Sequence, residues 1–181
     1  MTASSPHDSE HELDPEWEAL LRGTIISTTT QKFFNYVSLA DQKAQAMIIL
    51  NSILVPVIIN WADKPGYEWG VMIALGSAIS SILLSIICIY PKRRSGKKPD
   101  GSINYLHFGD IGRISEQEYL KRMKPIFNDN NQLSEASLKD LHDVARRIIL
   151  PKFFWLKCAY AVFFFGNLAA IICVLWVMQV S

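Results

Sequence analysis

Three long apolar runs, separated by polar stretches, dominate the pattern of hydrophobic and polar positions along the chain. They cover residues 44–61, 69–90 and 158–180. A helix of about eighteen residues is about 27 Å long, close to the bilayer's hydrocarbon thickness of about 30 Å. The second and third runs contain no charged residue, whereas the first is weaker because it contains Gln45, Asn51 and Pro56. The pattern predicts an all-α membrane protein with three transmembrane helices.

The link between the first two runs is short and contains Pro65-Gly66. This pair of residues favours a turn. Trp69 and Tyr90 stand at the two ends of the second run, where their rings suit the membrane interface. We therefore expect a transmembrane hairpin over residues 44–90, followed later in the chain by a third transmembrane helix over 158–180.

Clustered basic residues predict the orientation in the membrane. Five positive charges lie within residues 92–98, and four more precede the third run: Arg146, Arg147, Lys152 and Lys157. The positive-inside rule places residues 104–156 and the N-terminus in the cytoplasm of a multi-pass protein. The basic clusters either only set this topology or also contact anionic headgroups of the lipid bilayer, and the residues leave both open.

The polar segments outside the runs divide into three parts. Residues 1–14 are predicted to be a disordered tail. Residues 15–43 are expected to form a cytoplasmic helix that leads into the membrane, although the β-branched run Thr28–Thr30 can break it. Residues 91–157 predict a small cytoplasmic helical module, which is too small for an independent enzyme core. We expect this module to pack on the N-terminal helix or on partner subunits.

The first helix of the module is expected to begin at a capping box. Ser115 and Glu118 have the spacing at which the serine and the acid each satisfy a backbone N–H at a helix start. We expect this helix to stop before Pro125, because proline is a poor residue in a helix interior.

The second helix of the module is expected to follow a polar turn at residues 128–132 and to open at Ser134. Asp143 and Arg147 are one helical turn apart, a spacing that favours a supporting ion pair. Pro151 is expected to kink or end the helix.

No catalytic pattern stands out. His107, Asp110 and the pair His142-Asp143 superficially suggest a metal-dependent phosphohydrolase, but such a site needs a larger rigid domain. We therefore expect no enzyme, no metal and no cofactor, and the formal net charge of +1 offers no argument for nucleic-acid binding. The cysteines show no paired spacing and are expected to be buried thiols: Cys88, Cys158 and Cys173.

One face of the first helix combines small residues with an amide where the helix enters the membrane. Its members are Ala40, Ala44, Met47 and Asn51, and we call them the Ala40–Asn51 face. The charges of Asp41 and Lys43 lie beside it and must pair, face protein or reach toward the interface. From the residues alone we favour a packing face with one interhelical hydrogen bond. The alternative is a subunit interface that lines or gates a pathway.

These residues also carry a resemblance to a known family, the Pycsar transmembrane effectors. Ala40-Asp41-Gln42-Lys43-Ala44 followed by Asn51 resembles that family's signature where the first helix enters the membrane. Further similar stretches are His107–Ile111, Glu118-Tyr119 and Lys152–Lys157. The resemblance covers Gln31 to about Val174, and the order of hairpin, insert and last span agrees with it.

The resemblance implies an effector of antiphage defence in the bacterial inner membrane. A neighbouring cyclase would make cyclic CMP or cyclic UMP during infection. The effector would bind this nucleotide, impair the integrity of the membrane and cause abortive infection. Because three spans cannot enclose a pore alone, membrane damage further implies a homo-oligomer, with the Asp41–Asn51 segment as the candidate subunit interface.

A cyclic nucleotide offers a phosphate and a flat base, so its receptor needs cationic donors and a stacking surface. The insert supplies candidates but no spacing that defines a pocket: Arg113, Arg146, Arg147, Lys152, Tyr105 and Phe108. Because no pocket is defined, a second interpretation stays open. In that interpretation the chain is a constitutive membrane scaffold or small transporter subunit without a nucleotide ligand.

Overall fold

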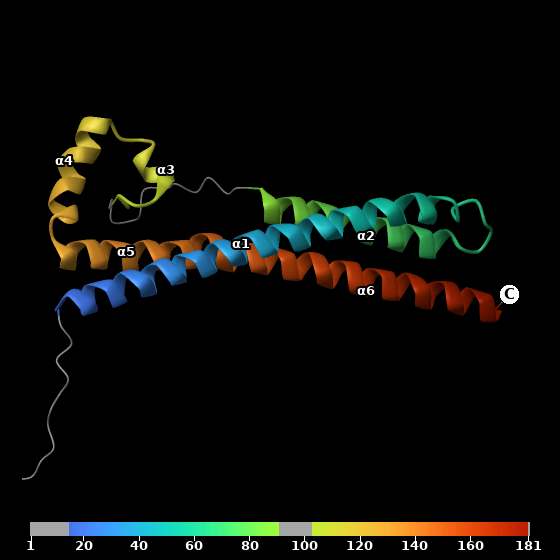
Figure 1. Ribbon diagram of the computed structural model, residues 1–181. Helices are drawn as coiled ribbons and strands as arrows, with labels where there is room; N and C mark the ends of the chain where they lie inside the picture. The colour runs from blue at the N-terminus through green and yellow to red at the C-terminus, as the bar shows by residue number, and fades with distance from the viewer. Residues whose placement is uncertain (1–14, 91–102, 181) are drawn as a thin grey trace, which may run out of the picture.

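The computed structural model describes residues 15–90 and 103–180, and these residues form helices and no strand (Figure 1). The predicted tail 1–14 and the basic run 92–98 lie outside the described residues. In chain order the helices are α1 (Pro15–Ile59), α2 (Glu68–Ile89), α3 (Phe108–Ile111), α4 (Glu116–Phe127), α5 (Asn130–Val144), the π-helical turn η1 (Ala145–Ile149) and α6 (Leu150–Val180). Three of the described helical stretches are long and apolar enough to cross a membrane. The prediction of an all-α protein with three transmembrane helices is confirmed.

A tight turn joins α1 to α2 at one end of the molecule, and the C-terminal end of α6 lies at the same end (Figure 1). Gly66 has a φ of 90°, a left-handed conformation that glycine adopts without steric cost. The rings of Trp61 and Tyr67 meet edge-on with centroids 5.9 Å apart, and Lys64 Nζ lies 3.9 Å from the Trp61 ring centroid. These contacts hold the hairpin closed at its turn.

Helix α1 runs unbroken through the threonine run at which a break was possible. The hydroxyls of Thr29 and Thr30 donate to the carbonyls of Ile25 and Ile26, each at 2.8 Å. These bonds stay within one helical turn, so the β-branched residues are accommodated without a break. One helix therefore extends from the N-terminal segment into the first span.

The start of α4 follows the sequence prediction, but its end does not. The Ser115 hydroxyl accepts the Glu118 backbone N–H at 3.3 Å and so caps the helix. The expected stop before Pro125 is wrong, because the helix continues through it. Pro125 lies in the last turn, where its fixed φ suits a helix and only one hydrogen bond is lost. The Asn128 N–H closes that turn on the Lys124 carbonyl at 3.1 Å.

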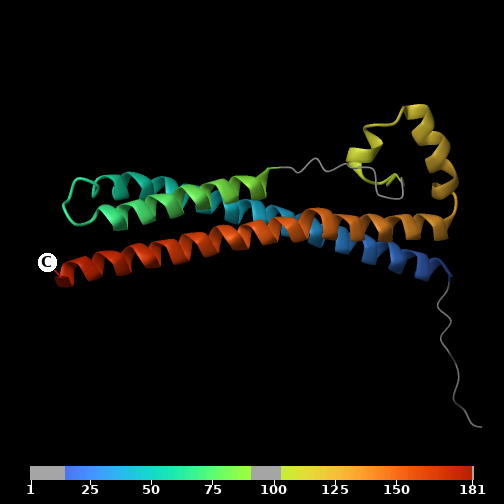
Figure 2. The same ribbon diagram turned by 180° about the vertical axis from the view of Figure 1, so that it is seen from behind.

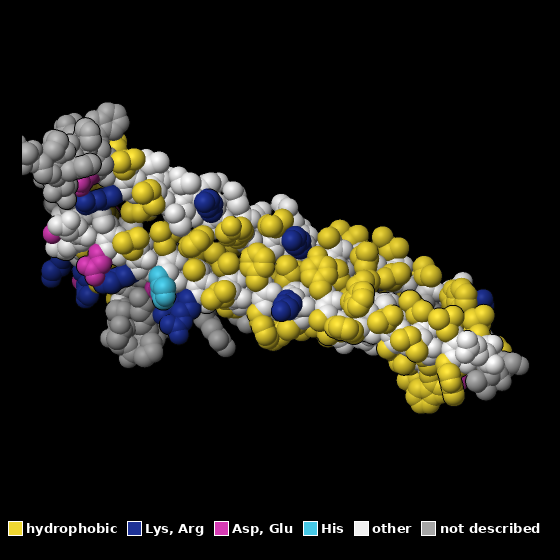
Figure 3. Space-filling view, turned by 90° about the horizontal axis from the view of Figure 1, so that it is seen from below, with side chains coloured by type: hydrophobic (Ala, Val, Ile, Leu, Met, Phe, Trp, Pro, Cys, Tyr) yellow, Lys and Arg dark blue, Asp and Glu magenta, His cyan; other side chains and the backbone are white. Residues whose placement is uncertain are grey.

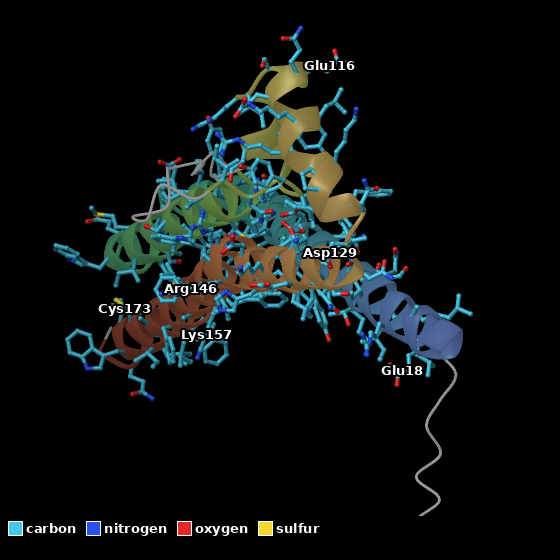
Figure 4. All side chains as sticks on the ribbon, turned by 90° about the vertical axis from the view of Figure 1, so that its left-hand side faces the viewer. Glu18, Glu116, Asp129, Arg146, Lys157 and Cys173 are labelled. Atoms are coloured by element: carbon cyan, nitrogen blue, oxygen red, sulfur yellow. The ribbon has the colours of Figure 1, made fainter. Side chains whose placement is uncertain are left out.

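Helix α5 begins earlier than predicted, because Asp129 and not Ser134 is its cap. The Asp129 carboxylate accepts the backbone N–H groups of Asn131 at 2.9 Å and Gln132 at 3.2 Å. Hydrogen bonds from Gln132, backbone and side chain, and then from Asn131 lower the pKa of Asp129. Ser134 lies inside the helix and donates to the Asn130 carbonyl at 2.8 Å. Figure 4 shows Asp129 at the junction of α4 and α5.

Pro151 does not end the second helix of the module, which continues through η1 into α6 as one rod (Figure 2). In η1 the Leu150 N–H bonds to the Ala145 carbonyl, five residues back. This wider turn takes up the lost N–H and the ring of the proline, which would clash in a regular α-helix. The predicted pair of Asp143 and Arg147 is confirmed at 3.7 Å in this region.

Helix α2 packs closely against α6 along a face of small side chains. We call this face the α2 stripe and define it as Gly70, Ala74, Ser77, Ala78, Ser81, Ser85 and Cys88, all buried. A methyl group added to Gly166 of α6 would collide with the side chain of Ser77. One added to Gly70 would lie 2.7 Å from Val174 Cγ2. Small residues at a crossing let two helix backbones approach closely in a membrane.

The outer faces of the three spans are apolar. Large side chains stay exposed there, for example Ile53 at 65 %, Leu83 at 56 % and Phe164 at 61 %. Seen from below, apolar side chains cover the part of the molecule formed by the spans, and charged side chains gather toward the end that carries α4 and α5 (Figure 3). This division fits a chain that is partly embedded in lipid and partly in water.

Candidate functional site

An ion pair ties the first span to the start of the third. The carboxylate of Asp41 on α1 pairs with the Lys152 ammonium at the beginning of α6, and their side chains are 29 % and 14 % exposed. The Cys88 thiol at the end of α2 donates to the Lys152 carbonyl at 3.3 Å. All three spans therefore meet at Lys152, directly after the π-helical turn and Pro151.

A small apolar cluster holds this ion pair in place. Ala40 and Ala44 flank Asp41 on α1 and are 0 % exposed, and they pack with Cys88 of α2 and Leu156 of α6. Because these side chains are small, the helices approach closely enough for the carboxylate to reach across to α6. Lys43, which was predicted together with Asp41, is exposed.

Deeper in the spans, a second polar contact links the same three helices. Asn51 Nδ2 donates to the Ser81 hydroxyl at 3.3 Å and to the Met47 carbonyl at 2.8 Å. The Ser81 hydroxyl donates to the Ala159 carbonyl of α6 at 3.2 Å. Such interhelical bonds contribute about 0.6–2 kcal/mol each in a membrane.

The structure thus places the Ala40–Asn51 face inside the chain's own bundle. Ala40, Ala44 and Asn51 are each 0 % exposed, and Met47 is 5 % exposed. The interpretation as a packing face with one interhelical hydrogen bond describes this geometry. A subunit interface at these positions would require the bundle to open first.

A buried amide organises the module and was missed by sequence reasoning. Asn104, 9 % exposed, donates from Nδ2 to the Asp140 carboxylate of α5 at 2.9 Å. Its backbone N–H donates to Asp110 at 3.1 Å, and its Oδ1 accepts the Leu106 N–H at 3.0 Å. An asparagine in a polar stretch carries no periodic signal, so only the fold reveals that it fastens this segment to α5.

The residues that superficially suggested a metal site have other contacts. His107 Nδ1 accepts the Gly109 N–H at 3.1 Å, and Asp110 accepts the Asn104 N–H. Within residues 15–90 and 103–180, no group of three His, Cys, Asp or Glu side chains is placed to hold a metal ion. The described cysteines are free thiols, of which Cys88 is buried and Cys158 and Cys173 are half-buried.

The six candidate nucleotide contacts do not share one set of partners. The Tyr105 hydroxyl accepts from Arg122 Nη1 at 2.8 Å, and this bond, together with Glu118, raises the pKa of Arg122. Arg147 pairs with Asp143, and Lys152 pairs with Asp41. The structure therefore directs these candidates to three different places.

The remaining three candidates are Arg113, Arg146 and Phe108. Arg113, in the link between α3 and α4, and Arg146, in η1, are exposed. Phe108 begins α3, and its side chain lies outside what the structure describes. Arg113, Arg146 and Arg147 are thus the exposed cations among the candidates, and Arg147 pairs with Asp143.

Three apolar spans, tied together by an ion pair and continuous with a helical module, define a multi-pass helical membrane protein. A family model described as the Pycsar effector protein domain matches residues 25–179. The chain belongs to this family and is an effector of Pycsar antiphage defence, which confirms the resemblance seen in its motifs. No curated protein and no solved structure matches the chain.

Proposed function

We propose that this effector is activated by a cyclic pyrimidine mononucleotide, cyclic CMP or cyclic UMP, made by a neighbouring cyclase. Once activated, it impairs the integrity of the bacterial inner membrane and causes abortive infection. The observation that carries this proposal is the family match over residues 25–179, which includes both the module and all three spans. The module then serves as the sensor and the spans as the membrane-active part.

The helix connections support such a division of labour. Helix α5 and η1 pack against α1, and both α1 and the α5–α6 rod continue into the spans without a loop. A displacement of α5 against α1 is therefore transmitted to the spans by continuous helices. We call the arrangement with Asp41 and Lys152 paired the closed form.

Activation requires that the nucleotide bind another form more tightly than the closed form. Arg146 is exposed and can give charge-assisted hydrogen bonds to the single phosphate. Arg146 lies in η1, between α5 and the ion pair, so a ligand there acts close to Lys152. Since three spans cannot surround a water-filled path, the active form is a homo-oligomer. The positive-inside rule supports a cytoplasmic N-terminus.

The test is expression of the full chain in bacteria, with cyclic CMP and cyclic UMP supplied separately. Propidium uptake and membrane potential are followed, and the protein is located by membrane fractionation. We expect rapid permeabilisation with one nucleotide and no effect with the other. No response to either, with the protein present in the inner membrane, would contradict the proposal.

The second candidate function is a constitutive membrane scaffold or small transporter subunit. It is favoured by one observation: Tyr105, Arg147 and Lys152 are directed to three different partners. Titration of the detergent-solubilised chain with each nucleotide separates the two candidates. Micromolar binding would exclude the scaffold or transporter function, whereas absence of binding up to millimolar nucleotide would favour it.

A further inference from the structure

The α2 stripe crosses the whole apolar part of the molecule. From Gly70 to Cys88 it extends about 27 Å, the length of a hydrocarbon core. Its inner end reaches the Asp41–Lys152 ion pair through the Cys88 thiol. Its outer end, at Gly70 and Ala74, opens into a groove of about 290 Å³ between the ends of α1, α2 and α6.

Three of the four serines of α2 lie in the stripe and are buried, and the fourth, Ser80, is exposed. Ser77, Ser81 and Ser85 are 8 %, 0 % and 0 % exposed, while the opposite face carries exposed Ile79 and Leu83. Asn51 of α1 adds its amide to the same interior, and Asn167 of α6 lines the outer groove. Polar groups inside a membrane are costly, so a row of them in the interior of the bundle requires a functional explanation.

Two of these polar atoms are unsatisfied in the closed form. Ser85 Oγ and Asn51 Oδ1 are buried and have no hydrogen-bond partner among the described residues. By contrast, Ser52, on an exposed surface of α1, donates to the Ile48 carbonyl at 2.8 Å. An unsatisfied buried polar group is unfavourable, and an alanine in place of Ser85, of nearly the same size, would avoid this cost. Water admitted to the stripe would satisfy both atoms.

We propose that the α2 stripe lines the water-filled path by which the activated effector lets small ions cross the membrane. The proposal rests on the proposed function and names the surface that carries the membrane defect. In the closed form α6 covers the stripe, with Gly166 against Ser77 and the Ala159 carbonyl on Ser81. Opening separates α6 from α2, breaks the Asp41–Lys152 pair at the inner end and turns the stripes of several copies toward a common axis.

The native Cys88 tests this proposal without a new residue in the stripe. In a Cys158→Ala, Cys173→Ala background, Cys88 is the one remaining thiol of the chain. Ser85→Cys and Leu83→Cys, made in that background with Cys88→Ala, compare the stripe with the lipid face at nearly the same depth. Each variant is reconstituted in vesicles of phosphatidylethanolamine and phosphatidylglycerol, after gel filtration confirms that it is folded.

Potassium release and reaction with a membrane-impermeant methanethiosulfonate are then measured with and without cyclic CMP or cyclic UMP. We expect nucleotide to start the leak and to raise the reaction rate of Cys88 and Ser85→Cys at least tenfold, while Leu83→Cys stays unreactive. Modification of Ser85→Cys should also reduce the leak.

A leak with unreactive Cys88 and Ser85→Cys overturns the stripe as the path and leaves the proposed function standing. Reaction of Leu83→Cys as fast as Ser85→Cys overturns it too, because the defect is then a general disruption of lipid around the chain. Absence of any leak with either nucleotide overturns the proposed function and the stripe proposal together.

Discussion

Replacing Asp41 by asparagine keeps the shape of the side chain and removes one charge of the ion pair with Lys152. Two unit charges about 4 Å apart attract by about 4 kcal/mol at an effective dielectric constant of about 20. Water offsets part of this attraction, because the two side chains are 29 % and 14 % exposed. Loss of one charge also leaves the other unpaired, so we expect the closed form to lose about 1–3 kcal/mol. This raises the ratio of open to closed form about 5- to 150-fold.

The assay is potassium release from reconstituted vesicles in the absence of nucleotide. Asp41→Asn should leak without a ligand and should need less nucleotide for a full response. Lys152→Met, which keeps the length of the side chain, should behave in the same way. The swap of Asp41→Lys with Lys152→Asp should restore much of the closed form. Lys157→Gln removes an exposed charge from the same helix and serves as the matched control, with no change expected.

The reasoning is refuted if both single variants stay as tight as the wild type and respond at the same nucleotide concentration. It is equally refuted if the charge swap leaks as strongly as the single variants. In the first case the pair contributes nothing to the stability of the closed form, which is the usual result for ion pairs that water reaches. In the second case the single variants act through local misfolding.

Three further predictions concern packing, capping and ligand binding. Gly166→Ala should destabilise the bundle by about 1–3 kcal/mol in thermal unfolding in detergent, because its methyl group collides with α2, whereas Gly76→Ala, with open space around it, should be neutral. The α5 cap should be fully present near neutral pH and should weaken as the pH falls through the lowered pKa of Asp129. In Asp129→Asn the amide caps the helix without titrating, so the helical circular dichroism signal should fall less on acidification than in the wild type. An unchanged acid profile would rule out this contribution. Arg146→Gln should weaken nucleotide binding at least tenfold in calorimetric titration. Lys139 is exposed on α5, and Lys139→Gln should leave binding unchanged. Equal effects of the two substitutions would show that Arg146 is not in the binding site.

The elements that were predicted correctly are those that depend on a local sequence pattern. Each apolar run is long enough to require a span, and Ser115 with Glu118 marks a helix start. The face with Ala44 and Asn51 was recognised from helical spacing, and its hydrogen bond to α2 was expected. These features depend on period, length and capping, which one sequence contains.

The features that were missed depend on what lies opposite in space. Pro151 was expected to disturb the helix, but the π-helical turn that absorbs it is not visible in the residue pattern. Lys152 was grouped with the phosphate donors because the approach of Asp41 from a distant helix could not be foreseen. The α2 stripe was overlooked, although serines and glycine recur along α2 at helical spacing. Its signal is the lack of large side chains on one face of an apolar run.

The rod formed by α5, η1 and α6 has a mechanical consequence. From Asn130 to Lys152 it extends about 33 Å beyond the level at which the three spans meet. A tilt of about 10° about Lys152 therefore moves the α4–α5 junction by about 6 Å. A helix of this length works as a lever, and it transmits motion in both directions. A shift of several ångströms in the module, the size of a nucleotide base, becomes a rotation of a few degrees at the crossing with α2. There the contacts are so close that a small rotation is enough to part them.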